Sequence, residues 1–222
     1  MVSVRVLGSE VAAIGKAAVW LTNRFGDASI TFDRTAPQPT PLVFVHGFLG
    51  DRTNFHGIRA SLLKRGVTNV AHFEYAPRLD WPRLATRLGH LLEALREAAG
   101  VRWVDVLGHS LGGLIARHLL EMRADAPIRR LVTLGAPYVG SPLPRNELAV
   151  FGDHDPIVPA PHPVYGPHAP HMHPGGRVVV VPECGHWGLL THETVTREIT
   201  RFLTSPSLSL THGDDTRLER AS

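Results

Sequence analysis

Six short apolar runs, separated by segments of helical periodicity, restrict this chain to a few possible folds. The runs are rich in β-branched residues, and their apolar positions are continuous rather than alternating. They read PLVFVHG, NVAHFEY, WVDVLGHS, RRLVTLGAP, LAVFGDHD and RVVVVPECGH. Continuous apolar runs of this length are typical of strands in a parallel sheet that is covered on both faces. The pattern therefore predicts about six core strands.

Helical patterns lie between several of these runs and after the last one. Apolar residues recur in them at the three- and four-residue spacing of one helix face. These residues are Leu84, Leu88, Leu91, Leu92 and Leu95 in the first pattern, Leu114, Ile115, Leu119 and Met122 in the second, and Val195, Ile199 and Phe202 in the third. Strands that alternate with helices predict an α/β fold, with an open, mostly parallel sheet and helices on both faces.

Length and composition are those of one globular domain with an extension at each end. The chain has 222 residues, 43% of them hydrophobic and 19% charged, so it can bury a sizeable core. We expect a helical extension and proline-rich linker at residues 1–40, the α/β domain at residues 41–204 and a polar tail at residues 205–222. Within the extension, Val11–Arg24 has the spacing of an amphipathic helix.

The charge pattern argues against nucleic acid as a partner. The net charge is only +3, and the arginines are scattered among acidic residues instead of forming a basic stripe. No apolar run approaches the roughly 18 residues of a membrane span. The N-terminus does not read as a signal peptide, because Lys16 interrupts its apolar stretch. We expect a cytoplasmic protein, with secretion as the alternative.

A serine directly after the third apolar run carries the first chemical signal. Residues 108–112 read GHSLG, which fits the pattern G-x-S-x-G between a predicted strand and a predicted helix. The sharp turn of this motif needs small residues on both sides of the serine, and it projects the hydroxyl beyond the sheet. The sequence therefore predicts Ser110 as a nucleophile. The alternative is a serine that only caps the following helix.

The residues that would activate Ser110 follow later predicted strands. A serine hydroxyl is a weak nucleophile unless a base accepts its proton. Asp153 and Asp155 follow the fifth run and His186 follows the sixth, which is the chain order of G-x-S-x-G hydrolases. We choose Asp155 as the acid because it lies in the loop beyond the strand, and we expect Asp153 to brace the turn. His186 would then act as the base, oriented by Asp155.

Two backbone N–H groups are candidates for stabilising negative charge on a substrate oxygen. The N–H of Leu111 lies at the N-terminus of the predicted helix. The second belongs to Phe48, after the first core strand, where Gly47 permits a close backbone approach. We expect His46 to brace this loop rather than to react.

Residues from about Pro41 to Leu203 resemble the small bacterial lipases of the α/β-hydrolase superfamily. The matching segments are VFVHGF, TNFHGI, VDVLGHSLGG, LVTLGAP, GDHDPIV and CGHWGLL, the last being similar to the G-H-x-G-L-L around that family's catalytic histidine. The resemblance implies a serine carboxylesterase or lipase that forms an acyl-enzyme intermediate and acts on a small-molecule ester or lipid without a cofactor. It also implies Ser110, Asp155 and His186 as the triad, with Phe48 and Leu111 as the oxyanion amides.

The connection between the fourth and fifth runs is too short for a helical lid. Larger lipases insert a lid here, whereas this chain has only Tyr138–Glu147, which contains two prolines. Val11–Arg24 is the other candidate for a lid, although its apolar face could equally dock on the core. We therefore expect a minimal, lidless enzyme with an exposed cleft near Phe48, Leu49 and Trp187. Such an enzyme should hydrolyse soluble esters with no rate jump at their solubility limit.

Other interpretations lead to different chemistry. The histidines of the proline-rich stretch before the last strand, His162, His168, His171 and His173, could bind a transition metal. We expect a surface loop without a metal, because nothing in their spacing makes the four imidazoles converge. Cys184 lies outside any nucleophile turn and is expected to be buried. Hydrolysis of an amide, thioester or lactone and a catalytically silent ligand-binding domain are the alternative functions.

Overall fold

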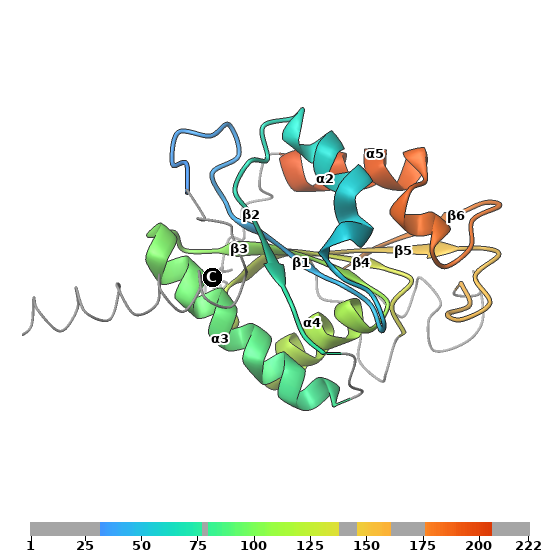
Figure 1. Ribbon diagram of the computed structural model, residues 1–222, viewed down its shortest axis with the longest axis horizontal. Helices are drawn as coiled ribbons and strands as arrows, with labels where there is room; N and C mark the ends of the chain where they lie inside the picture. Colours follow the sequence, from blue (N-terminus) through green and yellow to red (C-terminus); the bar gives the residue numbers. More distant parts are fainter. Residues whose placement is uncertain (1–31, 77–79, 138–145, 161–175, 206–222) are drawn as a thin grey trace, which may run out of the picture.

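A six-stranded sheet forms the centre of the molecule (Figure 1). The computed structural model describes residues 32–76, 80–137, 146–160 and 176–205. Its strands are β1 (Leu42–Val45), β2 (Val70–Phe73), β3 (Val104–His109), β4 (Ile128–Leu134), β5 (Glu147–Gly152) and β6 (Arg177–Val181). They lie in the order β2-β1-β3-β4-β5-β6, and every neighbouring pair is parallel. The predicted strands and the parallel sheet are thus confirmed.

Helices cover both faces of this sheet, as predicted. Figure 1 shows α3 (Trp81–Ala99) and α4 (Leu111–Met122) on one face, and α2 (His56–Leu63) and α5 (Glu193–Thr204) on the other. Two short 3-10 helices, η1 (Arg52–Phe55) and η3 (Gly188–Leu190), complete the described elements. The fold is therefore a three-layer α/β arrangement in which the sheet is the middle layer.

Two large apolar clusters, one on each face of the sheet, make up most of the core in the described residues. Successive side chains of a strand point to opposite faces. Along β1, Val43 and Val45 therefore pack in the cluster beneath α3 and α4, whereas Leu42 and Phe44 pack in the cluster beneath α2 and α5. All four are buried. This two-sided burial explains why the runs in the sequence are continuously apolar.

Local signals set the ends of α3, the longest described helix. The side chain of Asp80 accepts a hydrogen bond from the N–H of Arg83 at the N-terminus, and Pro82 lies in the first turn. Gly100 ends the helix in the left-handed region, with φ at 64°. Between these ends, the five predicted leucines are all buried.

Three details differ from the sequence analysis. Met122, the last residue of α4, is exposed, whereas Ile115 and Leu119 are buried as predicted. Strand β6 lies at the edge of the sheet and is not covered on both faces, so that Val180 is 43% exposed. Helix α2 was not predicted, because its eight residues bury only Ile58 and Leu62.

Several expectations concern residues outside the described ranges. These are the helix at Val11–Arg24, the lid-region residues 138–145, the histidines between residues 161 and 175 and the tail from residue 206. Among the helices that the structure does describe, none combines the length and apolar character needed to cross a bilayer.

Candidate active site

Ser110 stands in a strained turn between β3 and α4, at the carboxyl end of the sheet. Its backbone has φ at 53° and ψ at −120°, in a region that residues with a side chain rarely adopt. Its side chain makes no capping hydrogen bond with α4, and a helix cap ordinarily has an extended backbone instead. The side chain of Ser110 therefore does not cap α4, and its backbone has the strained conformation expected for the turn of a nucleophile motif.

Three glycines make this turn possible by allowing backbones to approach closely. A Cβ atom at Gly108 would lie 2.5 Å from the amide nitrogen of Gly113. A Cβ at Gly112 would lie 2.1 Å from the carbonyl oxygen of Val45, and one at Gly113 would lie 2.5 Å from the Cβ of Ala136. All three distances are far below van der Waals contact. Only glycine fits these positions, as the motif predicts for Gly108 and Gly112.

His186 and Asp155 form a buried pair at the same end of the sheet. Nδ1 of His186 lies 2.7 Å from Oδ2 of Asp155, and both side chains are almost inaccessible. The other carboxylate oxygen accepts the N–H groups of Ile157 and Val158, each at 2.8 Å. These bonds fix the carboxylate so that Oδ2 faces the imidazole. With Nδ1–H donating to Asp155, Nε2 of His186 is left as the proton acceptor.

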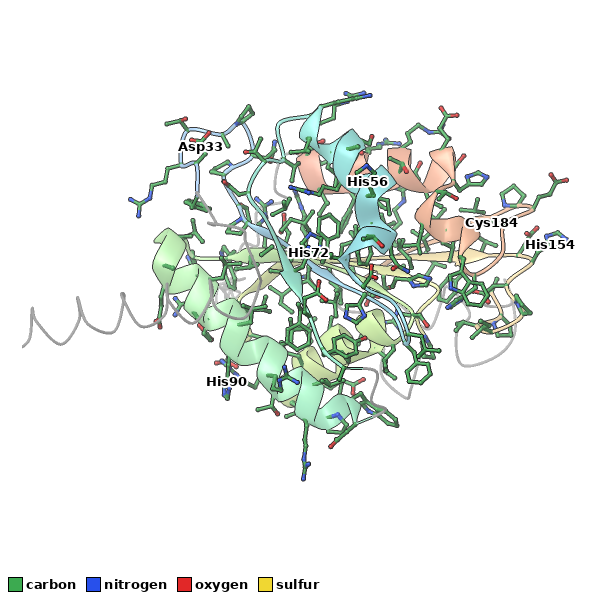
Figure 2. All side chains as sticks on the ribbon, viewed as in Figure 1. Asp33, His56, His72, His90, His154 and Cys184 are labelled. Atoms are coloured by element: carbon green, nitrogen blue, oxygen red, sulfur yellow. The ribbon has the colours of Figure 1, made fainter. Side chains whose placement is uncertain are left out.

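Asp153 lies in a different environment and does not approach His186. One of its carboxylate oxygens accepts the N–H of Cys184 at 3.3 Å and lies 2.7 Å from Nδ1 of His154. His154 and Cys184 are both labelled in Figure 2, near the loops that follow β5 and β6. Asp153 thus braces the two loops, and the structure brings Asp155 to the histidine.

Gly135, at the end of β4, is a part of the site that the sequence analysis missed. Its φ is 51°, and a Cβ there would lie 3.1 Å from both Oδ2 of Asp155 and Nδ1 of His186. The backbone of β4 therefore forms a wall of the acid–base pair. The N–H of Ser110 also donates to the carbonyl of Leu134, at 2.8 Å. A glycine directly after a central strand, in LVTLGAP, was the available signal.

The loop after β1 passes close to Ser110. A Cβ at Gly47 would lie 3.1 Å from the Cβ of Ser110, so this backbone lies against the nucleophile turn. Phe48 follows directly, and Leu111 is the first residue of α4, where N–H groups have no acceptor within the helix. The backbone thus places both predicted oxyanion residues beside Ser110.

His46 holds this loop in position. Its Nδ1 donates to the carbonyl of Gly47 at 2.9 Å, and its ring stacks on Tyr75 with a centroid separation of 4.1 Å. The hydroxyl of Tyr75 donates to the carbonyl of His46 at 2.5 Å. His46 is buried, and these contacts give it the bracing position that the sequence predicted.

Three large apolar side chains near the candidate catalytic residues are exposed. Leu49 is 76% exposed, Trp187 is 63% exposed and Phe48 is 46% exposed. The ring of Trp187 meets the ring of His186 edge-on, with centroids 5.4 Å apart. The three side chains that the sequence predicted to line a cleft are therefore apolar and exposed.

Cys184 is buried near these loops, as expected. Burial and the nearby Asp153 and Asp155 raise the pKa of its thiol, which disfavours the reactive thiolate.

Within the described ranges, no group of three or more histidine, cysteine or acidic side chains could hold a metal ion.

The known proteins to which this chain is similar are α/β hydrolases and lipases. Residues 40–149 match the model of the α/β-hydrolase fold. An sn-1-specific diacylglycerol lipase of Danio rerio is 35% identical over 85 residues, which cover 35% of this chain and 26% of that protein. A triacylglycerol lipase of Burkholderia plantarii is 28% identical over 162 residues, which cover 62% of this chain and 43% of that protein.

Solved structures share the fold at low sequence identity. A CIB-like hydrolase from Thermoplasma acidophilum has a TM-score of 0.57 and 16% identity, covering 75% of this chain and 87% of that one. The naproxen esterase of Bacillus subtilis has a TM-score of 0.55 and 15% identity, covering 77% and 84%. The chain matches less than half the length of these curated lipases. Its parallel sheet, its turn at Ser110 and these matches show that the chain has the α/β-hydrolase fold.

Proposed function

We propose that this protein is a serine carboxylesterase or lipase that hydrolyses acyl esters through an acyl-enzyme intermediate on Ser110. The observation that carries the proposal is the strained turn at Ser110, at the same sheet edge as the buried His186–Asp155 pair. The names of the related proteins, which include a diacylglycerol lipase and a triacylglycerol lipase, support ester substrates.

The first half of the reaction forms the acyl-enzyme. Nε2 of His186 accepts the hydroxyl proton while Oγ of Ser110 attacks the ester carbonyl. Asp155 remains ionised and stabilises the imidazolium that forms. The N–H groups of Phe48 and Leu111 donate to the oxyanion of the tetrahedral intermediate. The intermediate then collapses, and the leaving alkoxide takes the proton from His186.

The second half of the reaction returns the enzyme to its starting state. Water replaces the alcohol, and His186 accepts a proton from it as it attacks the acyl carbon. The same two N–H groups stabilise the second oxyanion. Collapse breaks the bond between the acyl carbon and Oγ, and the proton on His186 passes to Ser110. The products are an alcohol and a carboxylic acid.

The substrate binds against the exposed apolar side chains beside the triad. The acyl or alcohol portion of the ester contacts the uncharged, apolar side chains of Phe48, Leu49 and Trp187. We expect soluble esters to be hydrolysed at ordinary rates, with no jump when the substrate passes its solubility limit. Initial rates with tributyrin across that limit measure this, and a sharp rise at the onset of emulsion would contradict it.

The experiment that tests the function is ester hydrolysis by matched serine variants. A series of p-nitrophenyl esters from short to long acyl chains, with an anilide and a thioester of one chain length, defines the bond and the acyl preference. Ser110→Ala should lower kcat by roughly 1,000-fold or more. Ser61→Ala, a change on α2, should leave kcat within about twofold. Ester turnover by Ser110→Ala within a few-fold of the parent would overturn the proposal.

A further inference from the structure

We propose that His109 is a positioning residue for the catalytic base: its imidazole donates a hydrogen bond that holds the main chain of His186 against the nucleophile turn. This inference rests on the proposed function of Ser110 and His186. It assigns a role to a position that the G-x-S-x-G pattern leaves open.

The first observation is a direct hydrogen bond from the nucleophile turn to the loop of the base. His109 is the last residue of β3 and is almost fully buried. Its Nε2 lies 3.1 Å from the carbonyl oxygen of His186, and the two ring centroids are 4.7 Å apart. A carbonyl oxygen can only accept, so Nε2 of His109 carries the hydrogen.

The second observation is the distance in the sheet that this bond bridges. His186 follows β6, which is separated from β3 by β4 and β5. The loop after β6 must therefore extend past the ends of β5 and β4 to bring His186 to Ser110. A contact near Ser110 is needed to hold this loop in place. The bond from His109, one residue before Ser110, supplies that contact. A displacement of about 1 Å in such a site can cost about 100-fold in rate.

The imidazole of His109 also touches the loop that carries Phe48. A Cβ at Gly47 would lie 3.0 Å from Nδ1 of His109, so that the ring packs against this backbone. One side chain thus contacts the oxyanion loop and the base loop, and its backbone leads directly into the nucleophile. His109 can therefore set the distances between the Phe48 loop, the His186 loop and Ser110.

The charge state of His109 fits this role. Burial, together with the neighbouring His186, lowers the pKa of His109 to about 4. His109 is therefore neutral at pH 7 and donates from one nitrogen. Neutrality matters because His186 becomes positively charged during each half-reaction, and a second cation beside it would oppose that charge.

Three substitutions separate hydrogen bonding from space filling. His109→Gln places an amide NH₂ near the position of Nε2, His109→Phe keeps the ring shape without a donor, and His109→Asn carries the same amide on a shorter side chain. If His109 positions His186, the Phe and Asn variants should lose about 10- to 100-fold in kcat with KM within about twofold. The Gln variant should stay within about fivefold of the parent. Thermal unfolding midpoints show which variants are folded.

The result that overturns the proposal is a reversed order. A Phe variant as active as the parent, or more active than the Gln variant, would mean that the ring only fills space. A change confined to KM would also contradict a role in orienting the base. If His109→Phe does not fold, the Gln and Asn variants decide, since both carry the same amide.

Covalent labelling distinguishes this proposal from the function on which it rests. The rate of Ser110 modification by a fluorophosphonate is measured in the parent and in the three variants. We expect rapid labelling of the parent and of His109→Gln, and labelling slowed at least tenfold in His109→Phe. A parent that is not labelled would overturn both proposals. A parent and a Phe variant that are labelled equally fast would overturn the role of His109 alone.

Discussion

Removal of the Glu147 carboxylate should destabilise the fold far more than removal of an exposed carboxylate. Glu147 begins β5, and its side chain is fully buried. It accepts hydrogen bonds from Nε of Arg117 at 2.9 Å, from Nη2 of Arg117 at 2.6 Å and from the hydroxyl of Thr133 at 2.5 Å. Glu147→Leu leaves the guanidinium of Arg117 buried without its counter-charge.

The size of the effect follows from this uncompensated charge. Breaking a buried ion pair by removing one partner costs about 3–5 kcal/mol. In a domain of this length, 1 kcal/mol shifts the unfolding midpoint by about 2–4 °C, so Tm should fall by roughly 6–20 °C. The double variant Arg117→Met with Glu147→Leu should recover most of this loss, because an apolar pair can replace a buried ion pair at little cost.

Urea unfolding followed by circular dichroism measures these free energies. The matched control is Glu97→Leu, because the Glu97 side chain is 70% exposed and its nearest oxygen lies 3.9 Å from the guanidinium of Arg96. This control should change the free energy of unfolding by less than about 1 kcal/mol. A loss below 1 kcal/mol in Glu147→Leu, or a double variant no more stable than the single one, would refute the reasoning.

Three further predictions concern the acid, the response to pH and the turn. Asp155→Asn should lower kcat for ester hydrolysis by about 10⁴-fold and Asp153→Asn by less than tenfold; the opposite order would transfer the acid role. The pKa of His109 is about 4 in the folded protein and 6.5 in its ordinary state, so the unfolded chain binds a proton at this histidine at a higher pH than the folded chain does. Acidification from pH 6.5 to pH 4 should therefore lower the free energy of unfolding by up to about 3 kcal/mol. In urea unfolding at several pH values, the free energy of unfolding should fall less steeply with acidification in His109→Gln than in the parent. An equal dependence on pH in the two proteins would contradict the low pKa. Gly112→Ala should cost about 3 kcal/mol or prevent folding, because its Cβ would lie 2.1 Å from a carbonyl oxygen of β1. The control is Gly57→Ala on α2, where the nearest atom to an added Cβ would lie 3.9 Å away, and this change should be neutral or stabilising in the same unfolding assay. Equal losses of stability in the two alanine variants would contradict the close-approach argument.

The fold was predictable because its main determinants are local. Strand β3 and its neighbours are continuously apolar, and the leucines of α3 recur on one face, so sequence periodicity alone predicts both. Helix α2 was missed because it is short and weakly amphipathic. Val180 is exposed because β6 is an edge strand. The order of strands in a sheet cannot be predicted from local sequence patterns, so this exposure was not predicted.

The candidate site was predictable to the extent that its residues follow strand ends. Ser110, Asp155 and His186 each come after a predicted strand, and parallel strands bring their carboxyl ends to one edge. The supporting residues escaped prediction because their roles depend on long-range contacts. Gly135 matters only because it faces the acid–base pair, and His109 only because the carbonyl of His186 lies within reach.

The most direct test of the central claim is the site of covalent modification. The folded parent chain is treated with an organophosphonate ester, and intact-mass and peptide mass spectrometry locate the adduct. The account predicts one phosphonyl group per chain, on the peptide that contains Ser110. The adduct should be absent from Ser110→Ala and should form more slowly in the presence of excess ester substrate. A folded parent chain without an adduct at Ser110, or an adduct of the same yield in Ser110→Ala, would contradict the account.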